Sequence, residues 1–194
     1  MEVPIKEAIY EKGLGLKAIS LVANPAIEIS WIKMAKESEP LNTKLSIQDK
    51  EKRIIFTPVL IPNQLIKRNQ GGEVFDLFFS RETIEEIAIQ YQRDMLASAV
   101  DIQHSQNLIE GVTFFEVVLK DEKRNPTQIG FEDLPFGTLF MAGKVDNDEV
   151  WAKIESGELT GVSIDGMFGT MAVKASAVEL SDEKLKELLI QIEI

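Results

Sequence analysis

Cysteine is absent from this chain of 194 residues, and histidine occurs once. Without cysteine the protein has no disulfide framework, no thiolate nucleophile and no zinc finger. A single histidine also argues against a catalytic zinc site, because such sites usually draw on several imidazoles or thiolates. We therefore expect no metal and no cofactor. Chemistry that needs a neutral base near pH 7 has one obvious candidate, His104.

Positive charge and long apolar runs are also scarce. The 21 lysines and arginines are outnumbered by 32 acidic residues, which gives a net charge of −11, and an acidic field repels phosphate groups. The densest basic cluster, at residues 50–53, is offset by Asp49 and Glu51. No apolar run approaches the roughly 20 residues that span a bilayer. We expect neither nucleic acid nor a membrane as a partner, and a cytoplasmic location.

Extended segments outnumber helices in the predicted order of elements. Ser80 is expected to cap a helix whose apolar positions 84, 87, 88, 91 and 95 share one face. Asp146 is expected to cap a short second helix that Gly157 ends. Residues 69–72 read as a turn, and residues 121–136 as irregular structure. Strands are predicted over residues 14–26, 53–61, 73–79, 99–104, 112–119, 138–145 and 159–168.

The chain divides into one main body and its appendages. Residues 1–32 are expected to supply a strand and turn to the body, 33–52 a linker or mobile loop, 53–180 the body itself, and 181–194 an amphipathic helix. Strands and helices do not alternate regularly, which disfavours a doubly wound sheet. The expected class is α+β, a mainly antiparallel small β-barrel flanked by helices.

A serine and an aspartate share one predicted strand face. Ser163 lies mid-strand, and Gly161 and Gly166 leave room for close approach. Asp165 follows on the same face, about 7 Å along the strand. An imidazole that forms hydrogen bonds at both nitrogens spans a similar length, so His104 could bridge the two. The structural alternatives are a small polar residue in a tight place, a surface acid and an idle strand-end histidine.

Four passages of the chain carry a resemblance to a known family: residues 19–28, 100–104, 145–151 and 157–168. Together they resemble the XkdF-like serine proteases of tailed phages, which are relatives of the prohead maturation proteases and, more distantly, of herpesvirus assemblin. The histidine and serine passages occur in the order and separation that this family shows.

The resemblance implies a serine endopeptidase. Ser163 would be the nucleophile and His104 its base, on adjacent strands of a small barrel ringed by helices. The substrates would be scaffold and capsid proteins inside an immature phage head in the host cytoplasm. The assemblin relatives imply a homodimer.

Two departures from the family pattern concern the remaining catalytic groups. In the commoner prohead proteases a passage like residues 16–26 follows the catalytic serine and carries an acid; here it is N-terminal, as in a permuted chain, and Ala18 stands in the acid's place. Asp165 is the first candidate for the third member on geometry, and Glu116, in an apolar run, is the second. Assemblins also place arginines after the serine, whereas the last arginine here is Arg124. Backbone N–H groups or an earlier arginine would have to stabilise the oxyanion.

These departures keep a second hypothesis open. The same fold could serve as a non-catalytic capsid-assembly or scaffold module, with the apolar stripe of residues 181–194 recruiting partners. An acid–base enzyme acting on small molecules ranks last, because no cofactor motif supports it.

Overall fold

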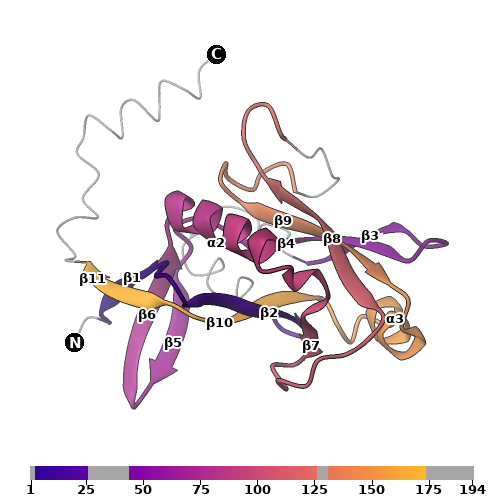
Figure 1. Ribbon diagram of the computed structural model, residues 1–194, viewed down its shortest axis with the longest axis horizontal. Coiled ribbons are helices and arrows are strands. Elements are labelled where there is room, and N and C mark those ends of the chain that lie inside the picture. The colour runs from indigo at the N-terminus through magenta and orange to yellow at the C-terminus, as the bar shows by residue number, and fades with distance from the viewer. Residues whose placement is uncertain (1–2, 26–43, 126–130, 174–194) are drawn as a thin grey trace.

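The computed structural model describes residues 3–25, 44–125 and 131–173. Within these ranges strands predominate, as Figure 1 shows. In chain order the elements are β1 (Ile5–Ile9), β2 (Gly15–Val22), β3 (Ser46–Asp49), β4 (Ile54–Leu60), β5 (Ile66–Gln70), β6 (Glu73–Phe79), α2 (Arg81–Arg93), the 3-10 helix η1 (Leu96–Ser98), β7 (Val100–Ile102), β8 (Val112–Leu119), β9 (Leu139–Val145), α3 (Asp148–Glu155), β10 (Gly161–Met167) and β11 (Gly169–Val173).

The strands form three sheets, with the orders β11-β1-β6-β5, β10-β2-β7 and β3-β4-β9-β8. Neighbouring strands are antiparallel except for the parallel pairs β1 with β6 and β2 with β7. The expected α+β class is confirmed. The barrel is not closed: β4 and β10 face each other across a small gap lined by side chains of both strands and of β5, but no ladder joins them.

The N-terminal strand β2 occupies the middle of its sheet. It pairs antiparallel with β10 and parallel with β7, although these strands lie far from it in the sequence. Burial explains this central place, because every residue of β2 except Lys17 is buried, and a strand covered on both faces is stabilised best between two partners. β2 thus joins the strand that carries Ser163 to the strand that precedes His104.

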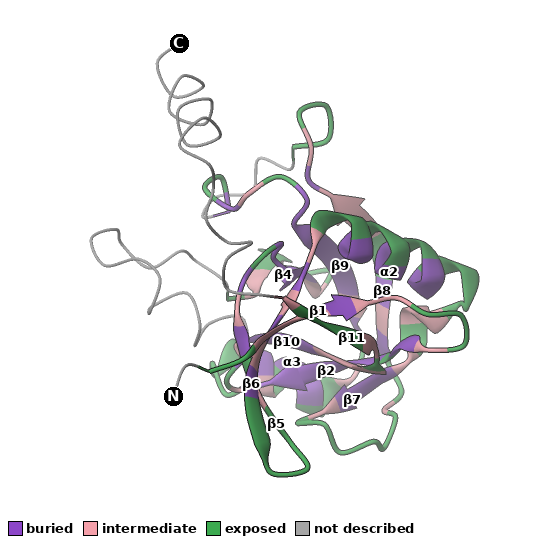
Figure 2. Ribbon diagram, turned by 90° about the vertical axis from the view of Figure 1, so that its left-hand side faces the viewer, coloured by how far each residue is buried: buried purple, intermediate pink, exposed green. Residues whose placement is uncertain are grey.

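One apolar core connects the three sheets. Figure 2 shows buried residues along the central strands and on one side of α2, and buried apolar residues from all three sheets belong to one cluster. The predicted cap of α2 is confirmed, since the Ser80 hydroxyl accepts a hydrogen bond from the Thr83 N–H. Ile84, Ile87 and Tyr91 are fully buried beneath this helix, whereas Met95 lies beyond its end and is exposed. No helix in the described ranges is long and apolar enough to cross a membrane.

The second helix begins one residue later than predicted. Asn147, not Asp146, is the N-cap of α3, and its side-chain oxygen accepts a hydrogen bond from the Val150 N–H. The Asp146 side chain instead pairs with Lys144 on the surface. Gly157 follows the helix with a positive φ of 75°, as expected of the residue that ends it.

Four strands escaped the sequence analysis. Two of them, β1 at residues 5–9 and β11 at residues 169–173, pair with each other. Residues 46–49, within the range read as a linker, form β3, and residues 66–70 form β5, which makes a hairpin with β6. The turn of this hairpin is at Gly71 and Gly72. The amphipathic helix expected over residues 181–194 lies outside the described residues, as do residues 26–43 of the N-terminal segment and linker.

Candidate active site

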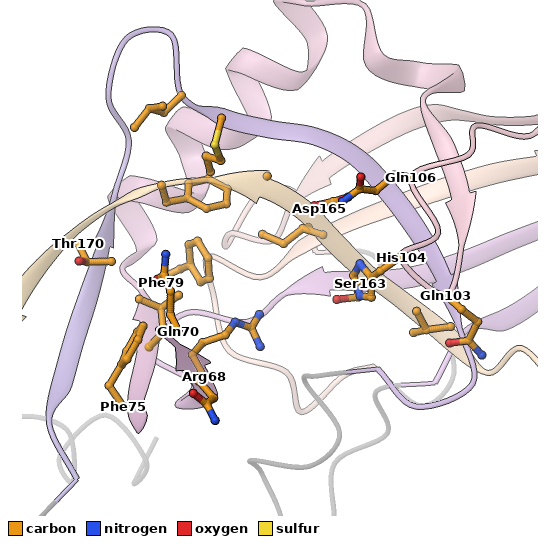
Figure 3. A pocket seen from close by; sticks show the side chains of 18 of the residues that line it. Arg68, Gln70, Phe75, Phe79, Gln103, His104, Gln106, Ser163, Asp165 and Thr170 are labelled. Atoms are coloured by element: carbon orange, nitrogen blue, oxygen red, sulfur yellow. The ribbon is translucent and has the colours of Figure 1, made fainter. Parts of the chain in front are cut away.

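A cavity of about 790 Å³ lies between β10, the β5–β6 hairpin and the loop after β7. Ser163, His104 and Asp165 all line it, and Figure 3 shows their side chains around it. Glu116 is not among the lining residues. It is exposed on β8, the edge strand of the β3-β4-β9-β8 sheet.

The register of the three-stranded sheet places three polar residues in one row. Ser20 of β2 is directly opposite Ser163 of β10 and directly opposite Asp101 of β7. All three residues are buried, with exposed fractions of 0% for Ser20 and Asp101 and 7% for Ser163. Directly opposite residues of an antiparallel pair have Cβ atoms about 5 Å apart on one face. Side chains that contact Ser20 on this face of the sheet therefore lie near the Ser163 hydroxyl.

Ser20 contacts both the Asp101 carboxylate and the His104 ring. Its hydroxyl donates a short hydrogen bond to Asp101 Oδ1, and its Oγ lies 3.1 Å from His104 Nδ1. An ionised carboxylate can only accept hydrogen bonds, so the single O–H of Ser20 is used in the bond to Asp101. The Ser20 oxygen can then only accept a hydrogen bond from the imidazole. Nδ1 then carries the ring proton, and Nε2 of the neutral ring is the basic nitrogen.

Asp101 also fixes the loop that carries the histidine. Its second oxygen, Oδ2, accepts a hydrogen bond of 2.8 Å from the Gln106 backbone N–H. Gln103, His104 and Gln106 have positive φ values of 55°, 56° and 62°, a region that residues other than glycine rarely adopt. Strained backbone of this kind persists where surrounding contacts impose it. The exposed His104 is therefore held over the sheet by a buried carboxylate.

The glycines around Ser163 are explained by packing within the protein. A Cβ on Gly166 would lie 2.5 Å from the Gly15 carbonyl oxygen, and one on Gly161 would lie 2.8 Å from the Pro25 ring. The first contact is with the neighbouring strand β2, at the bulge where the β10 register shifts. Room for close approach was correctly inferred, and it is β2 and Pro25 that occupy it.

Asp165 lies on the cavity wall and forms no hydrogen bond with the histidine. It is half-buried, lines the cavity with Ser163, and is paired across the strands with Ala18. The bridge expected between serine and aspartate through one imidazole is not formed, since His104 Nδ1 faces Ser20. Among the described residues no hydrogen bond joins Ser163 to His104; such bonds are often long in unliganded enzymes and tighten around substrate.

Ser20 and Asp101 are the two site residues that the sequence analysis did not select. Both lie within the passages that carry the family resemblance, and Asp101 precedes the only histidine by three residues. An acid in a short strand before that histidine was the available signal. The parallel pairing of β2 with β7, which brings the two residues together across 81 positions, has no local signature in the sequence.

One protein family matches most of this chain. The family model described as "Putative phage serine protease XkdF" matches residues 42–172, a span that includes Asp101, His104 and Ser163, while Ser20 lies before it. No curated protein and no solved structure matches the chain. The match covers well over half of the 194 residues, and the chain therefore belongs to the XkdF family of phage serine proteases.

Proposed function

We propose that the protein is a serine endopeptidase in which Ser163 is the nucleophile and His104 the general base. The observation that carries this proposal is the contact of Ser20 with His104 Nδ1, in the same row as Ser163. Both Ser163 and His104 line the cavity of about 790 Å³. A nucleophile, a base beside it and a group that orients the base together make the pattern of an activated serine.

The proposed reaction follows from the direction of these hydrogen bonds. His104 Nε2 takes the proton from the Ser163 hydroxyl as its oxygen attacks the substrate carbonyl carbon. The protonated ring then gives this proton to the leaving amine, so that the peptide bond breaks and an acyl-enzyme remains. Water, deprotonated by the same nitrogen, hydrolyses the ester and returns Ser163 to its starting state.

We assign the orienting role to Asp101, acting through the Ser20 hydroxyl. The carboxylate fixes the hydroxyl proton, the hydroxyl oxygen accepts from Nδ1, and the positive charge on the imidazolium is stabilised through this link. Asp165, the first candidate from the sequence, remains an alternative because it lines the same cavity. Glu116, the second, has no such support.

The biological setting is part of the proposal. Membership of a phage protease family supports scaffold and capsid proteins as substrates during prohead maturation, inside the immature head in the host cytoplasm. A homodimer and an assemblin-like relationship are proposed on the family resemblance alone.

Co-expression with the cognate capsid and scaffold proteins tests this function. We expect the wild-type protein to convert them to shorter products, and Ser163→Ala to leave them at full length. Ser156→Ala is the matched control, because Ser156 is an exposed serine at the end of α3 outside the cavity. Identical processing by wild type and Ser163→Ala would end the proposal.

A non-catalytic assembly module is the second candidate. The observation in its favour is that no hydrogen bond joins Ser163 to His104 among the described residues. It predicts that Ser163→Ala supports head assembly as well as the wild type does. A loss of infectious particles in that variant, with Ser156→Ala unaffected, would argue against it.

A further inference from the structure

The hydrogen bonds on which the proposed reaction rests do not involve one cation of the candidate active site. Arg68 lies on β5 and lines the large cavity together with Ser163 and His104. It also lines, with Ser163, the small gap between β10, β4 and β5. Figure 3 shows its guanidinium group reaching from β5 toward the Ser163 side of the cavity. Arg68 is therefore a neighbour of the proposed nucleophile in both spaces.

The strand β5 directs this side chain inward. Arg68 is opposite Phe75 of β6, whose side chain is buried, and it shares a strand face with the buried Ile66. Lys67, the next residue, is exposed on the other face, opposite Asp76. Alternation along the strand thus places one basic residue in solvent and the other in the cavity.

The guanidinium group of Arg68 has no carboxylate partner among the described residues. Its only hydrogen bond there is a long one of 3.4 Å to the Lys67 backbone oxygen. Burial lowers the pKa of Arg68, because partial removal from water disfavours the charged form. Of the described residues that line the large cavity, Arg68 is the only lysine or arginine, and Asp165 is the only carboxylate. These two residues do not form an ion pair.

We propose that Arg68 binds the carboxylate of an acidic residue in the substrate chain, close to the peptide bond that Ser163 attacks. This inference rests on the proposed function and names its specificity. A half-buried guanidinium group without a partner is stabilised when a carboxylate accepts two of its N–H groups. Asp165 would repel an acidic side chain on its own part of the wall, so the acidic residue is placed beside β5.

Cleavage of a mixed peptide library, read by mass spectrometry, tests this specificity. With the wild-type protein we expect Asp or Glu to be enriched at least about tenfold at one fixed position relative to the cut. Arg68→Gln should abolish this enrichment, and Arg68→Glu should shift it toward Lys and Arg. Lys67→Gln is the matched control, because Lys67 is on the outer face of the same strand and its loss should leave the profile unchanged.

Labelling of Ser163 by an uncharged fluorophosphonate separates this inference from the proposed function. We expect the labelling rates of wild type and Arg68→Gln to agree within about threefold, since the probe has no carboxylate for Arg68 to bind. Two results would overturn the inference and leave the proposed endopeptidase function intact. In the first, the wild-type protein is labelled but cleaves peptides with no preference for acidic residues; in the second, that preference survives in Arg68→Gln. If Arg68→Gln lowered the cleavage of every peptide and the labelling by the probe to the same extent, the inference would be overturned too, since Arg68 would then serve the reaction itself. Absence of both labelling and cleavage in the wild type removes the two together.

Discussion

The Ser20 hydroxyl has one proton, and it donates that proton in a hydrogen bond to the carboxylate of Asp101. The direction of this bond decides which nitrogen of His104 is basic, because the Ser20 oxygen is then free only to accept from Nδ1. Asp101 uses its other oxygen to hold the Gln106 N–H of the same loop. One buried carboxylate therefore sets both the position and the tautomer of the histidine.

Ser20→Ala tests the link between Asp101 and His104. We expect kcat on a cleaved peptide to fall about 10- to 100-fold with KM unchanged, because the imidazole loses the acceptor that holds it. Ser20→Thr retains the hydroxyl and should recover most of the lost kcat, a rescue that a purely structural role would not produce. Steady-state kinetics of the two variants, with thermal melts as a folding control, supply the measurement.

The same kinetics assign the acid. Asp101→Asn should lower kcat at least as much as Ser20→Ala, since an amide in place of the carboxylate no longer fixes the hydroxyl proton. Asp165→Asn should change kcat less than either, because no hydrogen bond joins Asp165 to the ring, whose Nδ1 faces Ser20. Full turnover in Ser20→Ala and Asp101→Asn, with a loss in Asp165→Asn, would return the orienting role to Asp165.

At the scale of single residues, the sequence identified Ser163 and His104 as candidates because each is distinctive where it stands. His104 is the only histidine, and Ser163 interrupts a strand flanked by glycines. Ser20 has no such distinctive feature, since a serine within an apolar run is most simply interpreted as a small residue required by tight packing. Its partners come from β7 and the following loop, and long-range strand pairing cannot be read from such a local pattern.

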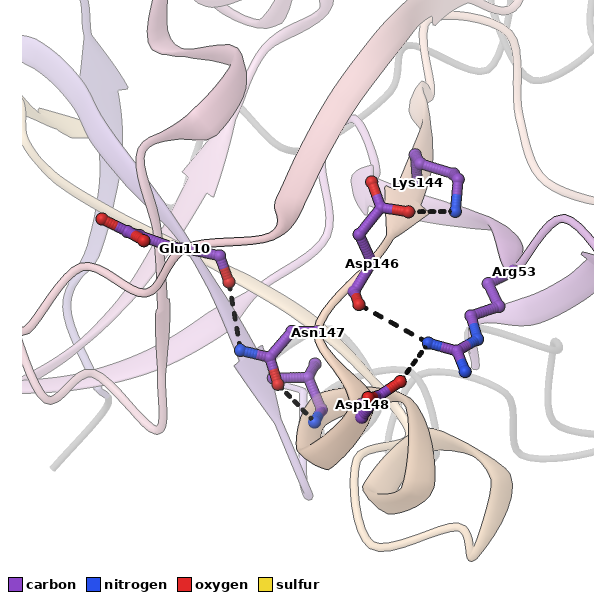
Figure 4. Close-up of polar contacts among 7 residues, drawn as sticks. Arg53, Glu110, Lys144, Asp146, Asn147 and Asp148 are labelled. Atoms are coloured by element: carbon purple, nitrogen blue, oxygen red, sulfur yellow. Dashed lines mark hydrogen bonds and ion pairs between the residues drawn. The ribbon is translucent and has the colours of Figure 1, made fainter.

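Among the secondary-structure elements, α3 shows how a cap depends on its surroundings. Figure 4 shows Asn147 donating to the Glu110 backbone oxygen and accepting from the Val150 N–H, while Asp146 pairs with Lys144. Asn147 thus ties the start of α3 to the loop before β8. In the sequence, Asp146 fits the capping-box pattern with Glu149, whereas the third residue after Asn147 is Val150. The contact with Glu110, which is distant in sequence, favours Asn147.

Asn147→Ala is expected to lower the free energy of unfolding by about 1 to 2 kcal/mol, because it removes the cap and the bond to Glu110. Asp146→Ala removes only an exposed ion pair and should cost less than about 0.5 kcal/mol. Urea denaturation of both variants measures the difference. A larger loss in Asp146→Ala would mean that the residue suggested by the sequence is the true cap.

Two of the strands that the sequence analysis missed, β3 and β5, are mostly polar. β5 contains the run Lys67 to Gln70 and shows little of the apolar alternation that marks a strand. It forms because the hairpin turn at Gly71 and Gly72 pairs it with the apolar β6. α2 was predicted closely because its cap and its apolar periodicity agree.

For the whole molecule, the three sheets and α2 meet around one core. Tyr91 of α2 is fully buried within it, and its hydroxyl has no hydrogen-bond partner in the described part of the chain. The class of fold followed from the many strands and few helices of the sequence. The arrangement of the strands did not, because β2 joins β10 and β7 by pairings over long sequence separations.

Tyr91 makes the stability of the protein sensitive to alkali. Burial raises the pKa of the Tyr91 phenol above its ordinary value near 10, so the folded state keeps the proton at a pH where the unfolded state releases it. Stability from this group is complete below pH 10 and falls above it, by at most about 1.4 kcal/mol for each pH unit.

Urea unfolding between pH 8 and pH 11 measures this effect. Tyr91→Phe should remove the part of the alkaline loss that belongs to this phenol, and it should not destabilise the protein at pH 8, because it deletes a buried hydroxyl without a described partner. Tyr10→Phe changes the other tyrosine, which is only half-buried. This variant should lose stability at alkaline pH as the wild type does. Identical pH profiles for wild type and Tyr91→Phe would contradict the prediction.

Covalent labelling by a fluorophosphonate probe tests the central claim most directly, since it requires an activated serine and no knowledge of the substrate. The proposed site predicts a single adduct on Ser163 in the native protein, located by peptide mass spectrometry. It also predicts that His104→Ala reduces the labelling rate at least about 100-fold, while circular dichroism shows an unchanged fold. An unlabelled Ser163 in the native protein, or equal rates with and without the His104 imidazole, would contradict the claim.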